Sequence, residues 1–90
     1  MQSTNDAKMG SIDEVHELLD FILQDGSISK NIREILKNIK EELADEKNIA
    51  LKINAALAKT EDLSLDPNLS ADVRTQLWNL ATLLEGAQRD

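Results

Sequence analysis

One histidine stands among carboxylates in the first third of the chain. His16 and Asp20 are four residues apart, which places both side chains on one face of a helix at a spacing that can hold a metal ion. A structural zinc site needs four ligands, however, and the nearby Asp13 and Glu17 are typical solvated carboxylates. We therefore expect His16 to be an ordinary surface histidine, and we expect no metal site.

No set of catalytic roles surrounds this histidine. A lone general base needs a nucleophile or a partner acid in a pocket, and the chain contains no Cys. The three glycines, Gly10, Gly26 and Gly86, are isolated, so there is no glycine-rich phosphate loop. We expect no catalytic residues, no cofactor and no enzyme activity.

The single tryptophan and the single phenylalanine both fall outside the apolar faces of their predicted helices. At about 100° per residue, Trp78 and Arg74 lie on the side of the last helix that faces away from its core residues. Either Trp78 makes a second contact within the chain, for example with Phe21, or it anchors an interface. Trp78, Arg74 and Phe21 are thus the candidate contact residues for an unknown protein partner or a homodimer.

A row of four basic side chains shares one face of another predicted helix: Lys30, Arg33, Lys37 and Lys40. This basic row could follow a phosphate backbone. Glu34 and Glu41 lie between its members, however, and are spaced to pair at i, i+4 with Lys30 and Lys37. The helix has no aromatic residue for stacking on bases. Binding of nucleic acid is therefore the less favoured alternative.

The helices that carry Trp78 and the basic row begin within a sequence pattern that occurs twice, with an offset of 41 residues. The two copies are Asp25-Gly26-Ser27-Ile28-Ser29-Lys30-Asn31-Ile32-Arg33 and Asp66-Pro67-Asn68-Leu69-Ser70-Ala71-Asp72-Val73-Arg74. Each copy predicts an Asp turn, an apolar residue, a Ser N-cap and a helix with Arg in its second turn. Asp25 with Arg33, and Asp66 with Arg74, are candidate turn and cap pairs. They could form a recognition pair or simply join the helices. A period near 40 residues indicates a helix–turn–helix unit used twice.

The hydrophobic periodicity predicts four helices after a flexible arm at residues 1–10. They run from a capping box at Ser11 to about residue 24, from Ser29 to about 46, from 45 or 48 to about 60, and from Ser70 to a stop at Gly86. The third helix carries apolar residues on two sides and is predicted to lie centrally. Residues 11–90 are predicted to form a single all-α domain, an up-and-down four-helix bundle of two αα hairpins. A HEAT-like repeat pair is a variant of this fold.

Composition and charge bear on the cellular location of the protein. The 90 residues have a net charge of −7, and no apolar run is long enough to span a membrane. An acidic surface repels nucleic acid and anionic membranes. Together with the polar N-terminus, these features predict a cytoplasmic protein that does not associate with membranes.

The duplicated pattern, together with Arg74-Thr75 and Trp78, resembles the small archaeal proteins of uncharacterised protein family 0147. The resemblance covers roughly residues 12–86. Ser29 and Ser70 stand where that family usually has Pro, a substitution that still suits a helix start. The resemblance implies an all-helical, up-and-down four-helix domain and implies no activity. We expect a small protein–protein interaction or assembly module.

Overall fold

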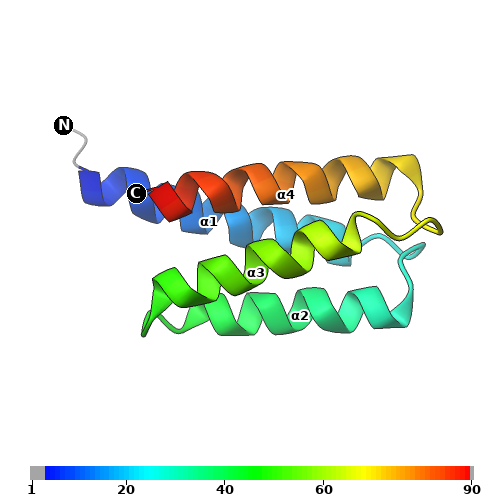
Figure 1. Cartoon of the computed structure of the whole chain (residues 1–90), viewed down its shortest axis with the longest axis horizontal. Helices are drawn as coiled ribbons and strands as arrows, with labels where there is room; N and C mark the ends of the chain where they lie inside the picture. The colour runs from blue at the N-terminus through cyan, green and yellow to red at the C-terminus, as the bar shows by residue number, and fades with distance from the viewer. Residues whose placement is uncertain (1–3, 90) are drawn as a thin grey trace.

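The chain folds into four helices that run alternately up and down. The computed structural model describes the backbone of residues 4–89 and the side chains of residues 12–88. In that range the helices are α1 (Thr4–Leu23), α2 (Lys30–Ala44), α3 (Ile49–Leu63) and α4 (Ala71–Arg89). The turns that follow α1 and α3 lie together at one end of the molecule, and the turn after α2 lies at the other end (Figure 1).

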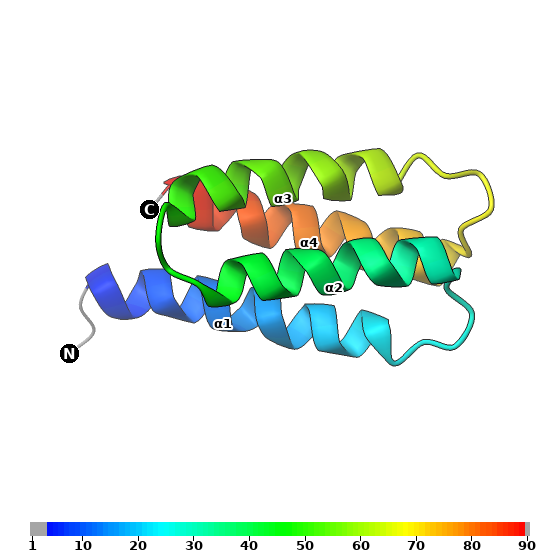
Figure 2. The same cartoon turned by 90° about the horizontal axis from the view of Figure 1, so that it is seen from below.

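Each helix packs against two neighbours. The contacting pairs are α1 with α2, α2 with α3, α3 with α4 and α4 with α1, whereas diagonally opposed helices do not approach closely. This closed ring is a four-helix bundle of two αα hairpins (Figure 2). The predicted fold class is therefore confirmed, in its bundle form rather than as a HEAT-type stack. No helix within the described range has both the length and the apolar character of a membrane-spanning segment.

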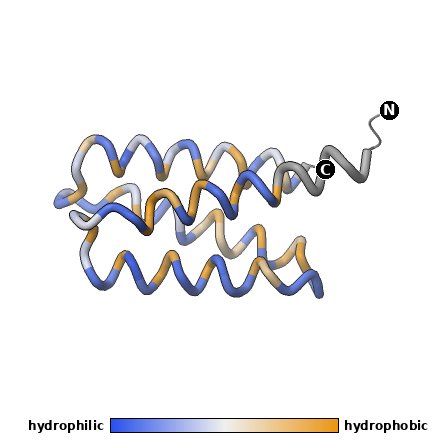
Figure 3. Tube along the Cα trace, turned by 180° about the vertical axis from the view of Figure 1, so that it is seen from behind, coloured by the Kyte–Doolittle hydropathy of each residue, from blue (hydrophilic) through white to orange (hydrophobic). Residues whose placement is uncertain are grey.

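The core contains a row of buried aliphatic side chains from each helix. Buried hydrophobic positions recur every three or four residues along the helices. Figure 3 shows hydrophobic and hydrophilic positions alternating along the tube. The duplication extends into this core, because the row in α2 has a buried counterpart 41 residues later in α4. The two rows are Ile32, Leu36, Ile39 and Leu43, and Val73, Leu77, Leu80 and Leu84. The one buried polar residue described, Thr60, donates its hydroxyl hydrogen bond to the Ala56 carbonyl at 2.8 Å.

The first helix starts earlier than the sequence predicts. α1 begins at Thr4, so the predicted start at Ser11 is wrong, and residues 4–10 of the predicted arm are helical. Residues 1–3 lie outside the described range. Extending an existing helix costs little, because each added residue gains one hydrogen bond. Gly10 opposes that extension by only about 1 kcal/mol relative to Ala.

The third helix is not central. Its second apolar side, formed by Leu51, Ala55 and Ala58, faces solvent, and Leu51 is 69% exposed. In a ring of four helices every member has two neighbours and an outer face, so no position is enclosed on all sides. The outer face of α3 is thus unusually apolar.

The last helix continues through its predicted stop. Gly86 lies within α4, which extends to Arg89, and its φ is not positive. A Cβ built on Gly86 would meet no atom within 4 Å. Because Ala has the higher helix propensity, we expect Gly86→Ala to raise the free energy of unfolding by about 0.5–1 kcal/mol. Urea denaturation of the two proteins measures this, and a destabilised variant would contradict it.

Candidate functional site

The two copies of the sequence pattern form two copies of one turn. The Oδ1 atom of Asp25 accepts a hydrogen bond from the backbone N–H of Ser27, and that of Asp66 accepts one from Asn68, both at 2.9 Å. The Ser N-caps match as well. The Oγ atom of Ser29 accepts from the N–H of Ile32 and that of Ser70 from the N–H of Val73, both at 3.2 Å. The turn signals in the sequence therefore have the predicted local structure.

The two arginines of the pattern hold these turns to the helices. Arg33 donates from Nη1 to the Leu23 carbonyl at 2.6 Å and from Nη2 to the Asp25 carbonyl at 3.3 Å. In the second copy Arg74 donates from Nε to the carbonyl of Ser64 at 3.2 Å and from Nη2 to that of Asp66 at 2.8 Å. Each Asp and Arg of a candidate pair is thus joined through the Asp backbone carbonyl. Both guanidinium groups are engaged within the fold.

Two carboxyl groups are held ionised by local donors. The hydroxyl of Ser27 at 2.7 Å, and then its backbone N–H, lower the pKa of Asp25. The backbone N–H of Lys47 at 3.1 Å, and then the Lys52 ammonium at 3.2 Å, lower the pKa of Asp45. In both cases the hydrogen bonds favour the charged form of the carboxyl group.

These shifts predict how stability depends on pH. Because the folded pKa of Asp25 and of Asp45 lies below 3.8, their charged forms stabilise the fold above that pH. This contribution is lost as the pH falls through the folded pKa values. A variant with both Asp25→Asn and Asp45→Asn should therefore lose less stability than the wild type on acidification below about pH 4. Denaturant midpoints measured across this range test the difference, and parallel curves for the two proteins would contradict it.

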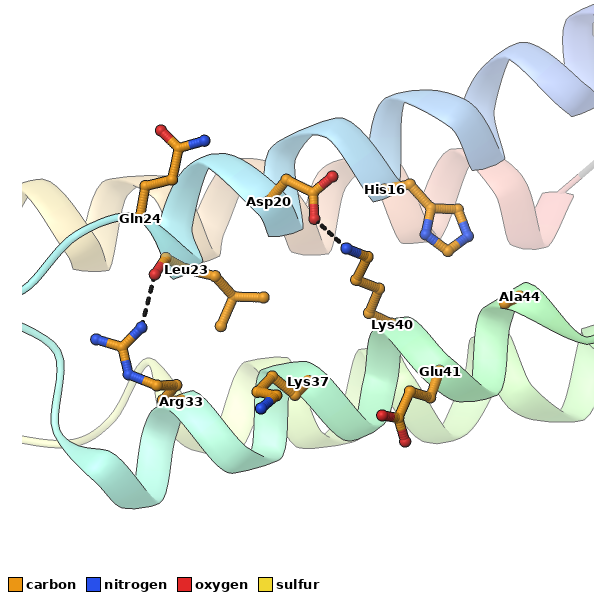
Figure 4. Close-up of a pocket in the computed structure, with 9 residues that line it drawn as sticks. All are labelled: His16, Asp20, Leu23, Gln24, Arg33, Lys37, Lys40, Glu41 and Ala44. Atoms are coloured by element: carbon orange, nitrogen blue, oxygen red, sulfur yellow. Dashed lines mark hydrogen bonds and ion pairs between the residues drawn. The ribbon is translucent and has the colours of Figure 1, made fainter.

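A groove of 790 Å³ lies between α1 and α2. Figure 4 shows that Asp20 of α1 reaches across to Lys40 of α2 and that Arg33 reaches the Leu23 carbonyl. The Lys40–Asp20 ion pair is partly exposed, with side chains 42% and 51% accessible. Lys37 lines the groove and makes no ion pair among the described residues. Two members of the basic row are therefore already engaged inside the molecule.

Two ion pairs that the sequence predicted within α2 are not formed in the structure. The predicted i, i+4 pairs of Lys30 with Glu34 and of Lys37 with Glu41 do not form among the described residues. Such pairs contribute only about 0.3–0.5 kcal/mol, too little to hold long side chains in one geometry.

His16 lines the groove near Asp20, and no group of three or more possible metal ligands occurs in the described part of the chain.

The equivalent surface on the second hairpin has different chemistry. Adding 41 to the residue numbers of the first groove places Trp78 where Lys37 stands, and Leu65 where Gln24 stands. Trp78 is 56% exposed and Leu65 is 77% exposed. The exposed side chain of Leu65 was not among the candidate site residues that the sequence suggested. The duplication was the signal that could have located it.

The structure separates Phe21 from the other two candidate contact residues. Phe21 is 59% exposed and lines a depression between α1 and α4 together with Asp72 and Gln76. Trp78 follows Gln76 by two residues, which turns its side chain by about 200° around α4. Trp78 is not among the residues of that depression. Arg74 and Trp78 share the α3 side of α4, one helical turn apart, whereas Phe21 lies on the opposite flank.

Comparison with known proteins shows similarity to one protein family. The model of Uncharacterised protein family (UPF0147) matches residues 1–87. A UPF0147 protein of Archaeoglobus fulgidus is 42% identical over 79 residues, covering 88% of this chain and 90% of its own. One from Methanosarcina acetivorans is 35% identical over 86 residues, covering 94% and 87%. The crystal structure of a protein from this family from Thermoplasma acidophilum superposes with a TM-score of 0.83 and 30% identity, over 89% of this chain and 95% of that one.

Proposed function

The chain belongs to Uncharacterised protein family (UPF0147), and we propose that it acts as a small cytoplasmic protein–protein interaction module. Its contact surface is the Trp78 face, which we define as Trp78 and Leu65 with the neighbouring parts of α3 and α4. The observation that carries the proposal is the exposed indole on the outside of an otherwise well-packed bundle. The proposal assigns no catalytic step to the chain.

The physical argument concerns the cost of leaving this surface in water. A tryptophan side chain is large and rigid, so covering it removes much apolar area at a small loss of conformational entropy. Trp78 is exposed and does not contribute to the core, so the fold itself does not require its size. Tryptophan is among the residues most enriched at interface hot spots. A partner that covers the Trp78 face therefore gains stabilisation that the isolated chain lacks.

The nucleic-acid alternative has less support. Arg33 donates to the carbonyls of Leu23 and Asp25, and Lys40 is paired with Asp20. Lys30 and Lys37 are therefore the members of the basic row that remain available among the described residues. Two cations neutralise about two phosphates, which supports only weak, salt-sensitive binding. Single-stranded DNA binding at low salt that is lost in a Lys30→Glu/Lys37→Glu variant would favour this alternative.

The proposed module can be tested with matched aromatic variants. Trp78→Ala and Phe21→Ala each remove one exposed aromatic side chain, but only the first lies in the Trp78 face. A specific partner should be retained from native lysate by immobilised wild type and by Phe21→Ala, and should be lost with Trp78→Ala. With that partner purified, we expect Trp78→Ala to weaken binding by about 2 kcal/mol, or roughly 30-fold.

The outcome against the proposal is equally specific. If wild type and Trp78→Ala retain the same proteins with the same affinity, the Trp78 face is not the contact surface. If Phe21→Ala alone loses the partner, the interface lies on the flank between α1 and α4. Both variants should have the same helical circular dichroism as the wild type, because neither residue is part of the core.

A further inference from the structure

The two hairpins differ at one ion pair. In the first hairpin the Asp20 carboxylate of α1 is paired with the Lys40 ammonium of α2 (Figure 4). The residues 41 positions later are Glu61 in α3 and Ala81 in α4. The second hairpin has thus kept the carboxylate at this position and lacks the lysine. No ion pair forms at Glu61 among the described residues.

The same comparison shows what replaces the charge. Lys37 and Lys40 are the two lysines of α2 that line the first groove, and their counterparts in α4 are Trp78 and Ala81. The second hairpin therefore has apolar side chains at these two positions, and its equivalent carboxylate, Glu61, makes no ion pair among the described residues. On the helical wheel Glu85 lies on the same flank of α4 as Trp78, two turns further on, and adds a second carboxylate to the border of the Trp78 face.

The C-terminal third of the chain is negatively charged, like Glu61 and Glu85. Residues 60–90 contain two Arg and six acidic residues, a net charge of −4, in a chain whose total is −7. The nearest cation to Trp78 in α4 is Arg74, and its guanidinium is bound to the carbonyls of Ser64 and Asp66. Around the Trp78 face, the charged side chains that the structure describes and that are not engaged within the fold are therefore acidic.

We infer that the Trp78 face binds a basic amphipathic helix, one whose apolar residues cover Trp78 and Leu65 and whose Lys or Arg side chains pair with Glu61 and Glu85. This inference rests on the proposed function and specifies the chemistry of the partner. The first hairpin shows the kind of pairing that we expect, because Lys40 of α2 is paired with Asp20 of α1. In the second hairpin Ala81 stands in place of this lysine, so the partner would supply the cation that pairs with Glu61. An amphipathic helix presents both kinds of side chain at the spacing of adjacent helical turns.

A second copy of the chain fits this surface less well. In a two-fold dimer the same patch contacts itself, so Glu61 and Glu85 of one copy would approach the same carboxylates of the other. Like charges placed opposite each other across an interface are unfavourable. The acidic border thus selects a partner of opposite charge.

The inference can be tested with three fluorescein-labelled model peptides of 18 residues, as an arbitrary length of about five helical turns. One carries Leu and Lys in an amphipathic helical pattern, one has the same pattern with Glu in place of Lys, and one has the Leu/Lys composition in scrambled order. Binding is followed by fluorescence anisotropy of the peptide. In a parallel titration with unlabelled peptide, the emission of Trp78, the one tryptophan of the chain, reports whether the indole leaves water.

We expect the amphipathic Leu/Lys peptide to bind and to shift the Trp78 emission to shorter wavelength, while the other two peptides bind at least about tenfold more weakly. Trp78→Ala should reduce the affinity about tenfold or more. The matched charge variants are Glu61→Gln and Asp20→Asn, which each remove one carboxylate at equivalent positions of the two hairpins. We expect Glu61→Gln to weaken binding severalfold and Asp20→Asn to leave it unchanged.

Several results would overturn the inference. Equal effects of Glu61→Gln and Asp20→Asn, or equal binding of the scrambled peptide, would show general attraction to an acidic protein instead of a defined site. Absence of binding by the Leu/Lys peptide would overturn the basic partner. If the Leu/Glu peptide binds, or if the chain dimerises, in a manner that depends on Trp78, the interaction module stands and its basic partner is excluded. If Trp78→Ala changes no binding at all, the proposed function fails as well.

Discussion

Leu36→Ala and Leu77→Ala should each lower the free energy of unfolding by about 2–5 kcal/mol. Both leucines are fully buried, and they occupy equivalent positions in α2 and α4. Replacement by alanine removes the transfer free energy of the lost side-chain atoms and leaves a cavity that the four packed helices fill only in part. A domain of this size is stable by only about 5–15 kcal/mol, so either change removes a large share of its stability.

Urea denaturation followed by circular dichroism measures this effect. Leu65→Ala is the matched control, because Leu65 is 77% exposed and should cost less than about 0.5 kcal/mol. Since Leu36 and Leu77 are related by the duplication, we expect their two costs to agree within about 1 kcal/mol. A loss below about 1 kcal/mol for either variant would show that its hairpin does not contribute to the common core as the structure indicates.

Arg74→Met should destabilise the protein by about 2 kcal/mol, and Arg33→Met by a similar amount. Methionine has nearly the length of arginine but donates no hydrogen bond. The variant Arg74→Met removes the guanidinium donor from the partly buried carbonyls of Ser64 and Asp66 and leaves the Asp66 carbonyl with the Leu69 N–H, which costs more than the loss of an exposed ion pair. The turn between α3 and α4 should open before the rest of the bundle.

Two measurements separate this role from a general effect of charge. Lys30→Met removes an exposed positive charge in the first turn of α2 and should change the unfolding free energy by no more than about 0.5 kcal/mol. Arg74→Lys should restore only part of the loss, because one ammonium cannot reproduce the planar, two-point geometry of a guanidinium. Amide hydrogen exchange should show faster exchange at Leu69 in Arg74→Met, since its N–H bonds to the Asp66 carbonyl. Full stability of Arg74→Met would show that the two hydrogen bonds contribute nothing.

Both pairs of variants use the internal duplication as a control. The turns, caps, arginine contacts and core leucines occur twice in nearly the same geometry. The outer surfaces of the two hairpins are not duplicated, since Lys37 and Lys40 in one correspond to Trp78 and Ala81 in the other. The scaffold is thus common to both hairpins, and the chemistry that distinguishes them lies on the outside. This is why the proposed contact surface is assigned to one hairpin only.

Local spacing in the sequence was enough to predict the parts of this protein that depend on neighbours two to four residues apart. Such neighbours produce the Asp turns, the Ser29 and Ser70 caps and the core rows of α2 and α4, so these could be predicted from spacing. The family resemblance was likewise visible in the duplicated pattern, and the family match confirms it.

Which side chains meet between helices depends on the packing of the bundle and could not be predicted from local spacing. The Lys40–Asp20 ion pair, the exposed side of α3 and the separation of Phe21 from Trp78 all depend on which helix lies beside which in the ring. The start of α1 and the end of α4 could not be predicted from local sequence either. One glycine costs too little to end a helix that other residues extend, as Gly10 and Gly86 show. Periodicity states that a residue lies on the outer side of a helix, but the neighbouring helices determine whether it is covered.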